Sequence, residues 1–233
     1  MAGVLEIKEL VVGFTSRSGE VRLIEAFDDS VDLGQLVCLI GLNGSGKTTL
    51  LRTILGRIPA LSGMAIWNGT EVRSIPPKDF SRMAAVVSTE RQIPALMLSQ
   101  DIVALGRSPY TGILGALSSK DRTVIENAMI STGCSDLYGR RVGELSDGER
   151  QKILLARAIA QDTDVLVLDE PNTFLDLRNR AMMFLAVKKL CVDLGKTILL
   201  STHDIQLALQ LADRLWVIGE DHQLYLGSRD EIL

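Results

Sequence analysis

The sequence has few cysteines, no excess of positive charge and no long apolar run. Its three cysteines, Cys38, Cys134 and Cys191, lie far apart. This odd, scattered set indicates reduced thiols rather than a disulfide framework or a metal site. With 25 Lys and Arg against 29 Asp and Glu, the chain lacks the basic footprint of a nucleic-acid-binding protein. We therefore expect no nucleic acid among its partners.

No apolar stretch approaches the roughly 18–20 residues that a membrane-spanning helix needs. The first residues also lack the basic and then apolar segments of a secretory signal. The 233 residues are 46% apolar and 23% charged, the composition of a globular protein with a substantial core. These features predict a protein of the cytosol or of the inner face of a membrane.

The most informative stretch is an apolar run of strand length at 36–40, followed by a glycine-rich segment at 41–49. This segment, which we call the phosphate loop, reads G-x-x-x-x-G-K-T from Gly41 to Thr48. Glycines let the backbone curl so that successive N–H groups point at one anion. The helix expected at 50–55 adds its positive N-terminal end. The pattern predicts that the chain binds a nucleoside triphosphate.

Within the phosphate loop, Lys47 is expected to reach the β- and γ-phosphates, and the Thr48 hydroxyl is expected to hold Mg²⁺. The alternative is an ordinary glycine turn between a strand and a helix, but few such turns carry this full pattern. The predicted phosphate-binding residues are Gly41, Asn43, Gly44, Ser45, Gly46, Lys47, Thr48 and Thr49.

Two carboxylates, Asp169 and Glu170, directly follow a second apolar run at 165–168. In open α/β sheets, ligands bind at the carboxyl ends of the strands. Asp169 is expected to join the Mg²⁺ shell, and Glu170 to orient or deprotonate the attacking water. Two acids after a strand are a weak signal alone, but with the phosphate loop they predict nucleotide hydrolysis.

The order of the expected elements indicates an α/β core that carries a helical insert. Strand–helix alternation before and after an all-helical stretch implies a parallel-sheet core. We assign residues 1–88 and 162–233 to the core and residues 89–161 to a helical subdomain. The expected strands are 5–12, 21–27, 36–40, 63–67, 84–88, 165–168, 197–201 and 215–218, with a polar turn at 15–20; the expected helices are 50–55, 79–83, 99–105, 119–131, 146–160, 176–194 and 205–213.

Residues 145–149, Leu-Ser-Asp-Gly-Glu, open the helix expected at 146–160. Ser146 and Glu149 have the S-x-x-E spacing of a capping box, so this segment first of all indicates a helix start. A capped helix with Ser146 and Gly148 in its first turn can also receive an anion.

These segments together resemble the ATP-binding-cassette (ABC) ATPases, over nearly the whole chain. Residues 145–149 resemble the LSGGQ signature, and they lie between the phosphate loop and the acid pair as in that family. Leu175 and Asp176 resemble the D-loop, and His203 the switch histidine. Phe14 stands where the family places an aromatic ring that stacks on adenine. The resemblance implies the ABC ATPase fold: a P-loop NTPase parallel-sheet core with an N-terminal antiparallel β subdomain and a helical insert.

The same resemblance implies a homodimer that uses ATP and Mg²⁺. Two copies would face head to tail, so that Ser146 and Gly148 of one copy touch the γ-phosphate held by Lys47 of the other. Glu170, Lys47 and His203 are the expected catalytic residues. Dimer closure would depend on ATP, and opening on hydrolysis.

The sequence departs from the family pattern at two places. Asp147 and Glu149 stand where the signature has glycine and glutamine, and we expect the Asp147 side chain to point outward, since a carboxylate repels a γ-phosphate. The family also expects a glutamine after the strand at 84–88. Here either Thr89, or Glu90 beside it, replaces that contact to Mg²⁺, or Gln92 reaches in; the register favours Thr89.

Residues 104–112 and 117–121 resemble the ABC subfamily that imports iron–siderophore chelates, haem and cobalamin. The resemblance implies the ATP-hydrolysing subunit of such an importer, peripheral to the cytoplasmic face of the inner cell membrane. It would bind a separate permease through a groove near 89–112, and act indirectly with a substrate-binding protein. The alternatives are an ABC ATPase of another transporter class and a soluble, non-transport ABC ATPase.

Overall fold

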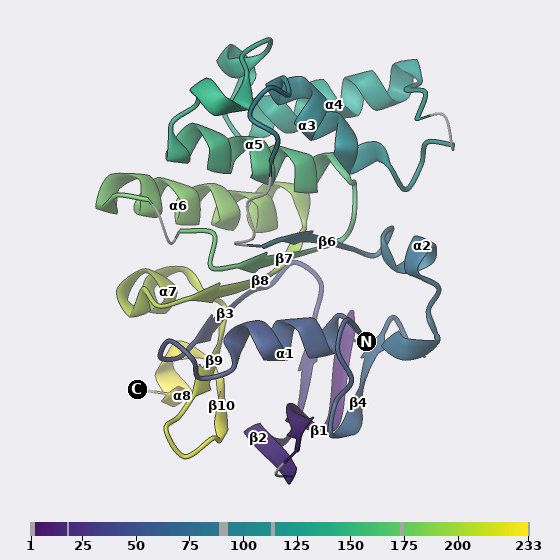
Figure 1. Ribbon diagram of the computed structural model, residues 1–233. Helices are drawn as coiled ribbons and strands as arrows, with labels where there is room; N and C mark the ends of the chain where they lie inside the picture. Colours follow the sequence, from purple (N-terminus) through teal and green to yellow (C-terminus); the bar gives the residue numbers. More distant parts are fainter. Residues whose placement is uncertain (1–2, 18, 89–92, 113–114, 173–174, 233) are drawn as a thin grey trace.

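Two sheets and their helices are stacked in layers in the computed structural model (Figure 1). An antiparallel sheet, a single helix, a larger sheet and two groups of helices follow one another through the molecule. The structure describes residues 3–17, 19–88, 93–112, 115–172 and 175–232. Among the helices of those ranges, none has the length and apolar character needed to cross a membrane.

The larger sheet has the strand order β10-β9-β3-β8-β7-β6. Its strands are parallel except for β10, which pairs antiparallel with β9. This confirms the predicted parallel-sheet core. The strands are β3 (Leu36–Ile40), β6 (Ala84–Val87), β7 (Val165–Asp169), β8 (Thr197–Thr202), β9 (Arg214–Ile218) and β10 (Leu224–Gly227). Strand β10 and the short helix α8 (Arg229–Ile232) were not among the expected elements, because this edge strand is only partly buried and its apolar pattern is weak.

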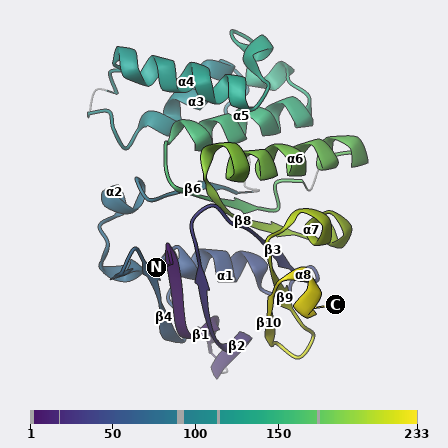
Figure 2. The same ribbon diagram turned by 180° about the vertical axis from the view of Figure 1, so that it is seen from behind.

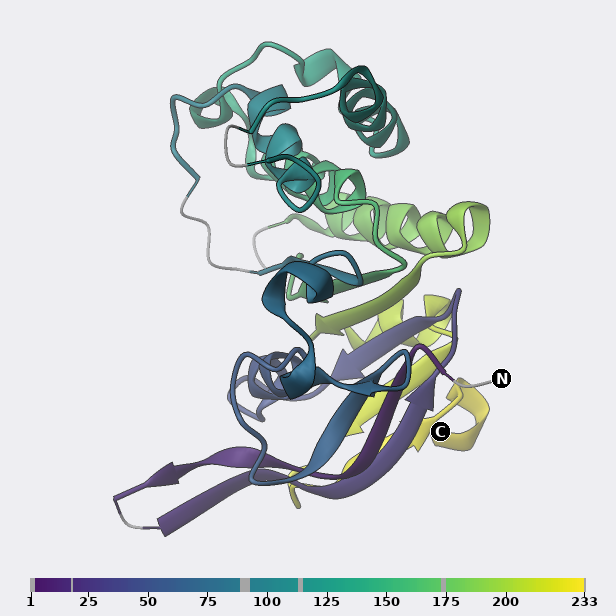
Figure 3. The ribbon, with the colours of Figure 1, turned by 90° about the vertical axis from the view of Figure 1, so that its right-hand side faces the viewer.

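The antiparallel sheet has the order β2-β1-β4-β5. It is formed by β1 (Leu5–Ser16), β2 (Gly19–Val31), β4 (Ser62–Trp67) and β5 (Thr70–Glu71). The prediction of a polar turn at 15–20 is wrong, because the strands continue into this segment: Thr15 pairs with Glu20 and Ser16 with Gly19. Figure 3 shows that this end of the β1–β2 ribbon extends beyond the body. At this end the backbones of β1 and β2 pair with each other, but neither face of the ribbon is buried. Polar residues can therefore continue both strands.

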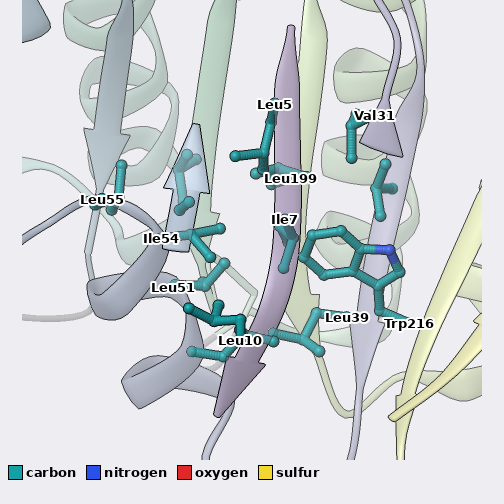
Figure 4. Close-up of a cluster of buried hydrophobic side chains, with 14 of the residues drawn as sticks. Leu5, Ile7, Leu10, Val31, Leu39, Leu51, Ile54, Leu55, Leu199 and Trp216 are labelled. Carbon is teal, nitrogen blue, oxygen red and sulfur yellow. The ribbon is translucent and has the colours of Figure 1, made fainter. Parts of the chain in front are cut away.

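Helix α1 (Lys47–Ile54) lies between the two sheets and packs on both. Figure 4 shows the apolar cluster at this junction, where side chains of β1, α1 and the larger sheet meet. The Trp67 indole also donates a hydrogen bond to the Ile54 carbonyl oxygen at 2.7 Å. The helix that begins at Lys47 is therefore held by burial on two sides. Residues of this cluster include Leu5, Ile7, Leu10, Leu39, Leu51, Ile54, Leu199 and Trp216.

The opposite face of the larger sheet is covered by helices, as Figure 2 shows. Helix α6 (Leu177–Leu194) buries Phe184 and Val187 there, beside α7 (Ile205–Leu211). Helix α5 (Asp147–Ala160) joins two apolar clusters. Its Leu155 packs toward the sheet, whereas its Ile153 packs among α3 and α4.

The remaining helices form the outer group around α5. They are α3 (Ser99–Ala104) and α4 (Ser119–Ser131), with the 3₁₀ turns η2 (Leu105–Arg107), η3 (Ser135–Leu137) and η4 (Val142–Glu144). Near the larger sheet, η1 (Val72–Ser74) and α2 (Pro77–Phe80) precede β6. Within the outer group, Arg107 is buried; its Nε donates to Asp121 Oδ1 and its Nη1 to the Ala160 carbonyl oxygen, both at 2.8 Å.

Candidate functional site

The carboxyl ends of β3, β7 and β8 bring the phosphate loop and the two predicted acids to one edge of the larger sheet (Figure 1). The phosphate loop follows β3, and Asp169 ends β7. In the sheet register, Asp169 lies opposite Ser201, and Ile40 opposite Thr202. Because these strands are parallel neighbours, three segments far apart in the sequence converge there.

The phosphate loop has the backbone that its glycines permit. Gly44 and Gly46 have φ values of +82° and +104°, a backbone conformation that residues with a Cβ rarely adopt. A Cβ at Gly46 would also lie 3.1 Å from the Leu23 Cβ of β2. The loop borders a pocket of about 340 Å³, lined by Leu23, Asn43, Gly44, Gly46, Lys47, Thr48, Thr49 and Glu170.

Lys47 is buried across this loop, with only 4% of its surface exposed. Its Nζ donates hydrogen bonds to the carbonyl oxygens of Gly41, at 2.9 Å, and Leu42, at 3.0 Å. The same Nζ lies 3.2 Å from Glu170 Oε1. A buried ammonium requires such partners, and these contacts hold its charge beside the pocket.

Thr48 and Asp169 supply oxygen atoms of the kind that Mg²⁺ prefers. The Thr48 hydroxyl donates to Asp169 Oδ1 at 3.1 Å. In the loop itself, Ser45 Oγ is buried and has no hydrogen-bond partner within the described ranges. The buried cation, the orphaned hydroxyl and the paired oxygens together fit a phosphate with a divalent cation.

The backbone of Glu170 is strained, with a φ of +46°. For a residue with a side chain, this conformation costs on the order of 1–3 kcal/mol. The Glu170 N–H donates to Ser201 Oγ at 2.8 Å, and that hydroxyl donates to Asp169 Oδ1 at 2.7 Å. Sequence reasoning missed Ser201, because a serine near the end of an apolar strand carries no spacing signal.

The predicted capping box is present at the start of α5. Ser146 caps the helix, and its N–H and hydroxyl each donate to Glu149 Oε2 at 2.8 Å. These hydrogen bonds lower the pKa of Glu149. The Asp147 side chain is 53% exposed and lies 3.1 Å from Arg150, so it points outward as expected. Gly148 lines a separate, mostly apolar pocket.

Seven predicted residues of the described ranges do not line the pocket at the phosphate loop. Gly41, Ser45 and Asp169 lie in or beside the loop, whereas Phe14, Ser146, Gly148 and His203 lie on other segments. Phe14 is 51% exposed on the β1–β2 ribbon, where it pairs with Val21, two residues before Leu23. His203 is exposed between β8 and α7.

Two predictions remain: the residue that replaces the glutamine contact to Mg²⁺, and Asp176 of the D-loop. Thr89, and the alternatives Glu90 and Gln92, lie outside the described residues. Asp176, expected in the D-loop, caps α6 by accepting a hydrogen bond from the Asn179 N–H at 2.8 Å.

Comparisons with known proteins agree with this geometry. Residues 25–173 match the family model described as ABC transporter. An ABC transporter ATP-binding protein of Methanocaldococcus jannaschii is 36% identical over 99% of this chain and 78% of its own length. The achromobactin transport ATP-binding protein of Dickeya dadantii is 33% identical over 97% of this chain and 82% of its own length.

A solved structure is similar over almost the entire fold. It belongs to a transporter assigned to the metal-chelate type of ABC transporter, in an inward-facing conformation. The two chains share 25% identity, with a TM-score of 0.85 over 99% of this chain and 85% of the other. The family match, the relatives and the fold agree: the chain belongs to the ABC transporter family and is one of its ATP-binding proteins.

Proposed function

We propose that this protein is the ATP-hydrolysing subunit of an ABC importer that takes up a metal chelate through a separate membrane permease. The observation that carries the ATPase part is that Lys47, Thr48 and Glu170 line one pocket, with Asp169 hydrogen-bonded to Thr48 beside it. The chelate class rests on the achromobactin relative and the metal-chelate type neighbour. Iron–siderophore complexes, haem and cobalamin are the chelates that we propose.

The residues around the pocket have different proposed roles in hydrolysis. The phosphate loop N–H groups and Lys47 bind the phosphates of ATP, and Thr48 and Asp169 hold Mg²⁺, with Thr89 as a further ligand. Bound Mg²⁺ would neutralise charge on the transferring phosphoryl group. Phosphate oxygens compete with Glu170 for Lys47, which leaves the Glu170 carboxylate to orient or deprotonate water.

A homodimer accounts for the predicted residues that lie away from the pocket. Ser146 and Gly148 are in the first turn of α5, where a helix N-terminus favours an anion. In a head-to-tail pair, these residues would meet the γ-phosphate bound by the partner copy. In this pair His203 would contact the same phosphate and Phe14 would stack on adenine; both side chains are exposed.

The permease contact belongs to the segment near residues 89–112. Within its described part, Leu96 is 78% exposed and Tyr110 is partly exposed, which makes both available to a partner. The division into a core of 1–88 and 162–233 and a helical subdomain of 89–161 is part of this proposal. Docking on a permease would place the chain at the cytoplasmic face of the membrane, opposite the substrate-binding protein.

Replacing Glu170 with glutamine tests the ATPase part. We expect Glu170→Gln to bind ATP normally and to slow hydrolysis about 100-fold or more, because the amide cannot accept the proton. The control is Glu126→Gln on the exposed surface of α4, which should keep full turnover. Unchanged turnover in Glu170→Gln would remove Glu170 from this role.

Co-purification from membranes tests the importer part. We expect the tagged chain to bring down an integral membrane permease that is active with a metal chelate. Sedimentation with ribosomes instead would contradict the importer and favour a soluble ABC ATPase.

A further inference from the structure

We propose that Ser201 is a positioning residue for ATP hydrolysis, which joins Asp169 and Glu170 through one buried hydroxyl. The proposal rests on the proposed function and adds a residue to the same site. Ser201 is the fifth residue of β8 and is fully buried, with 0% of its surface exposed. It is too enclosed to contact a nucleotide, so any effect must pass through its neighbours.

The Ser201 hydroxyl uses both of its hydrogen-bonding capacities on the two acidic residues. It donates to Asp169 Oδ1 at 2.7 Å and accepts from the Glu170 N–H at 2.8 Å. A serine hydroxyl has one hydrogen to donate and accepts through its lone pairs. One side chain therefore orients the carboxylate expected to hold Mg²⁺ and the backbone that carries the expected base.

The first consequence concerns Asp169. The hydroxyls of Thr48, in α1, and Ser201, in β8, both donate to the same oxygen, Oδ1. Two donors on one oxygen fix the rotation of the carboxylate, and neither bond uses Oδ2. Partners that orient a metal ligand in this way typically affect metal affinity or activity by 10- to 100-fold.

The second consequence concerns Glu170. Its φ of +46° is a strained conformation that persists only where the surroundings hold it. The Glu170 N–H is partly buried at this turn, and it donates to Ser201 Oγ. Without the hydroxyl, the turn would lose a contact that holds the strained backbone. The Glu170 carboxylate would then no longer be oriented toward the pocket.

The experiment compares three variants in the full-length protein. Ser201→Ala removes the hydroxyl and leaves the chain otherwise intact. Ser201→Thr keeps the hydroxyl in a strand position that suits β-branched residues. The matched control is Thr197→Val in the same strand: Thr197 is also fully buried, donates to the Asp32 carbonyl oxygen at 3.3 Å and accepts from the Gly34 N–H at 2.9 Å.

The main readouts are nucleotide affinity with and without Mg²⁺, and the separate values of kcat and KM for ATP. For Ser201→Ala we expect unchanged affinity for ATP in EDTA, because the phosphate loop is intact. The Mg²⁺ concentration for half-maximal binding and turnover should rise about tenfold, and kcat should fall 10- to 100-fold with little change in KM. Ser201→Thr should recover most of the loss, and Thr197→Val should match the wild type.

Amide exchange in the nucleotide-free protein gives a readout independent of activity. The Glu170 N–H should exchange faster in Ser201→Ala than in Thr197→Val. Wild-type kcat and Mg²⁺ dependence in Ser201→Ala would overturn the proposal, as would an equal loss in Thr197→Val or no recovery in Ser201→Thr. A wild-type protein that does not hydrolyse ATP would instead overturn the proposed function itself.

Discussion

Lys47 shows how much of the site depends on single side chains. Its ammonium is buried and is held by two carbonyl oxygens of its own loop and by the Glu170 carboxylate. All three partners are oxygen acceptors of the kind that phosphate also offers. The lysine is therefore placed to exchange a carboxylate for a phosphate without leaving the loop.

Lys47→Ala should weaken ATP binding by at least about tenfold, since hydrogen bonds to a charged group are worth about 1.5–3 kcal/mol. Titration with a fluorescent ATP analogue measures the affinity. Lys120→Ala, at an exposed position of α4, is the control and should bind as the wild type does. Wild-type affinity in Lys47→Ala would contradict the assignment of the phosphate loop.

At the scale of elements, the outer helices are tied together by a buried ion pair. Arg107 of η2 contacts Asp121 of α4, and it also donates to the last residue of α5, Ala160. Tyr110 stacks on the same guanidinium, whose carbon lies 4.1 Å from the ring centre. Hydrogen bonds from Ser118 and then from Arg107 lower the pKa of Asp121 from 3.8 to about 2.

Replacing Arg107 with methionine should reduce the free energy of unfolding by about 3–5 kcal/mol, because it leaves Asp121 buried without its cation. Urea unfolding measures the change. Arg122→Met, on the exposed side of α4, is the matched control and should cost less than about 0.5 kcal/mol. A loss in Arg107→Met no larger than that of the control would mean that the pair contributes nothing to stability.

The pH dependence of unfolding provides a check on the same pair. Because the folded pKa of Asp121 is below its unfolded value, its contribution is fully present above about pH 4 and is lost as the pH falls through about 2. The wild type should therefore lose more stability than Arg107→Met between pH 4 and pH 2. Parallel curves for the two proteins would contradict this account.

At the scale of the whole molecule, the two sheets are joined by polar contacts as well as by the apolar core. Asp29 of β2 accepts hydrogen bonds from Arg214 at 2.6 Å and from the Trp216 indole at 2.7 Å, both in β9. The β1–β2 ribbon and the strand that precedes the phosphate loop are thus held in one body.

A site divided between two copies predicts dimers that depend on the nucleotide. Glu170→Gln should form a dimer with ATP and Mg²⁺ and remain a monomer with ADP, because in the proposed dimer only the γ-phosphate would bridge the two copies. Light scattering after size exclusion measures the mass. A monomer in both states would mean that closure needs the permease, and a dimer in both would contradict a nucleotide-driven cycle.

Features that depend on short spacing follow from the local order of the residues. The strand, glycine turn and helix around Lys47, the capping box of Ser146 and Glu149, and the acids that end β7 could all be predicted. Each requires only neighbouring residues, whose conformations and hydrogen bonds follow from local chemistry. The order of these motifs was also sufficient to identify the family and the sheet core.

Contacts between distant segments could not be predicted in this way, and they are seen only in the folded chain. The link from Ser201 to Asp169, the pairing of Lys47 with Glu170 and the burial of Arg107 all join residues that no spacing relates. The extension of the β1–β2 ribbon and the added edge strand β10 likewise depend on pairing rather than on apolar pattern. Such contacts form when the chain packs, because register and burial are properties of the whole fold.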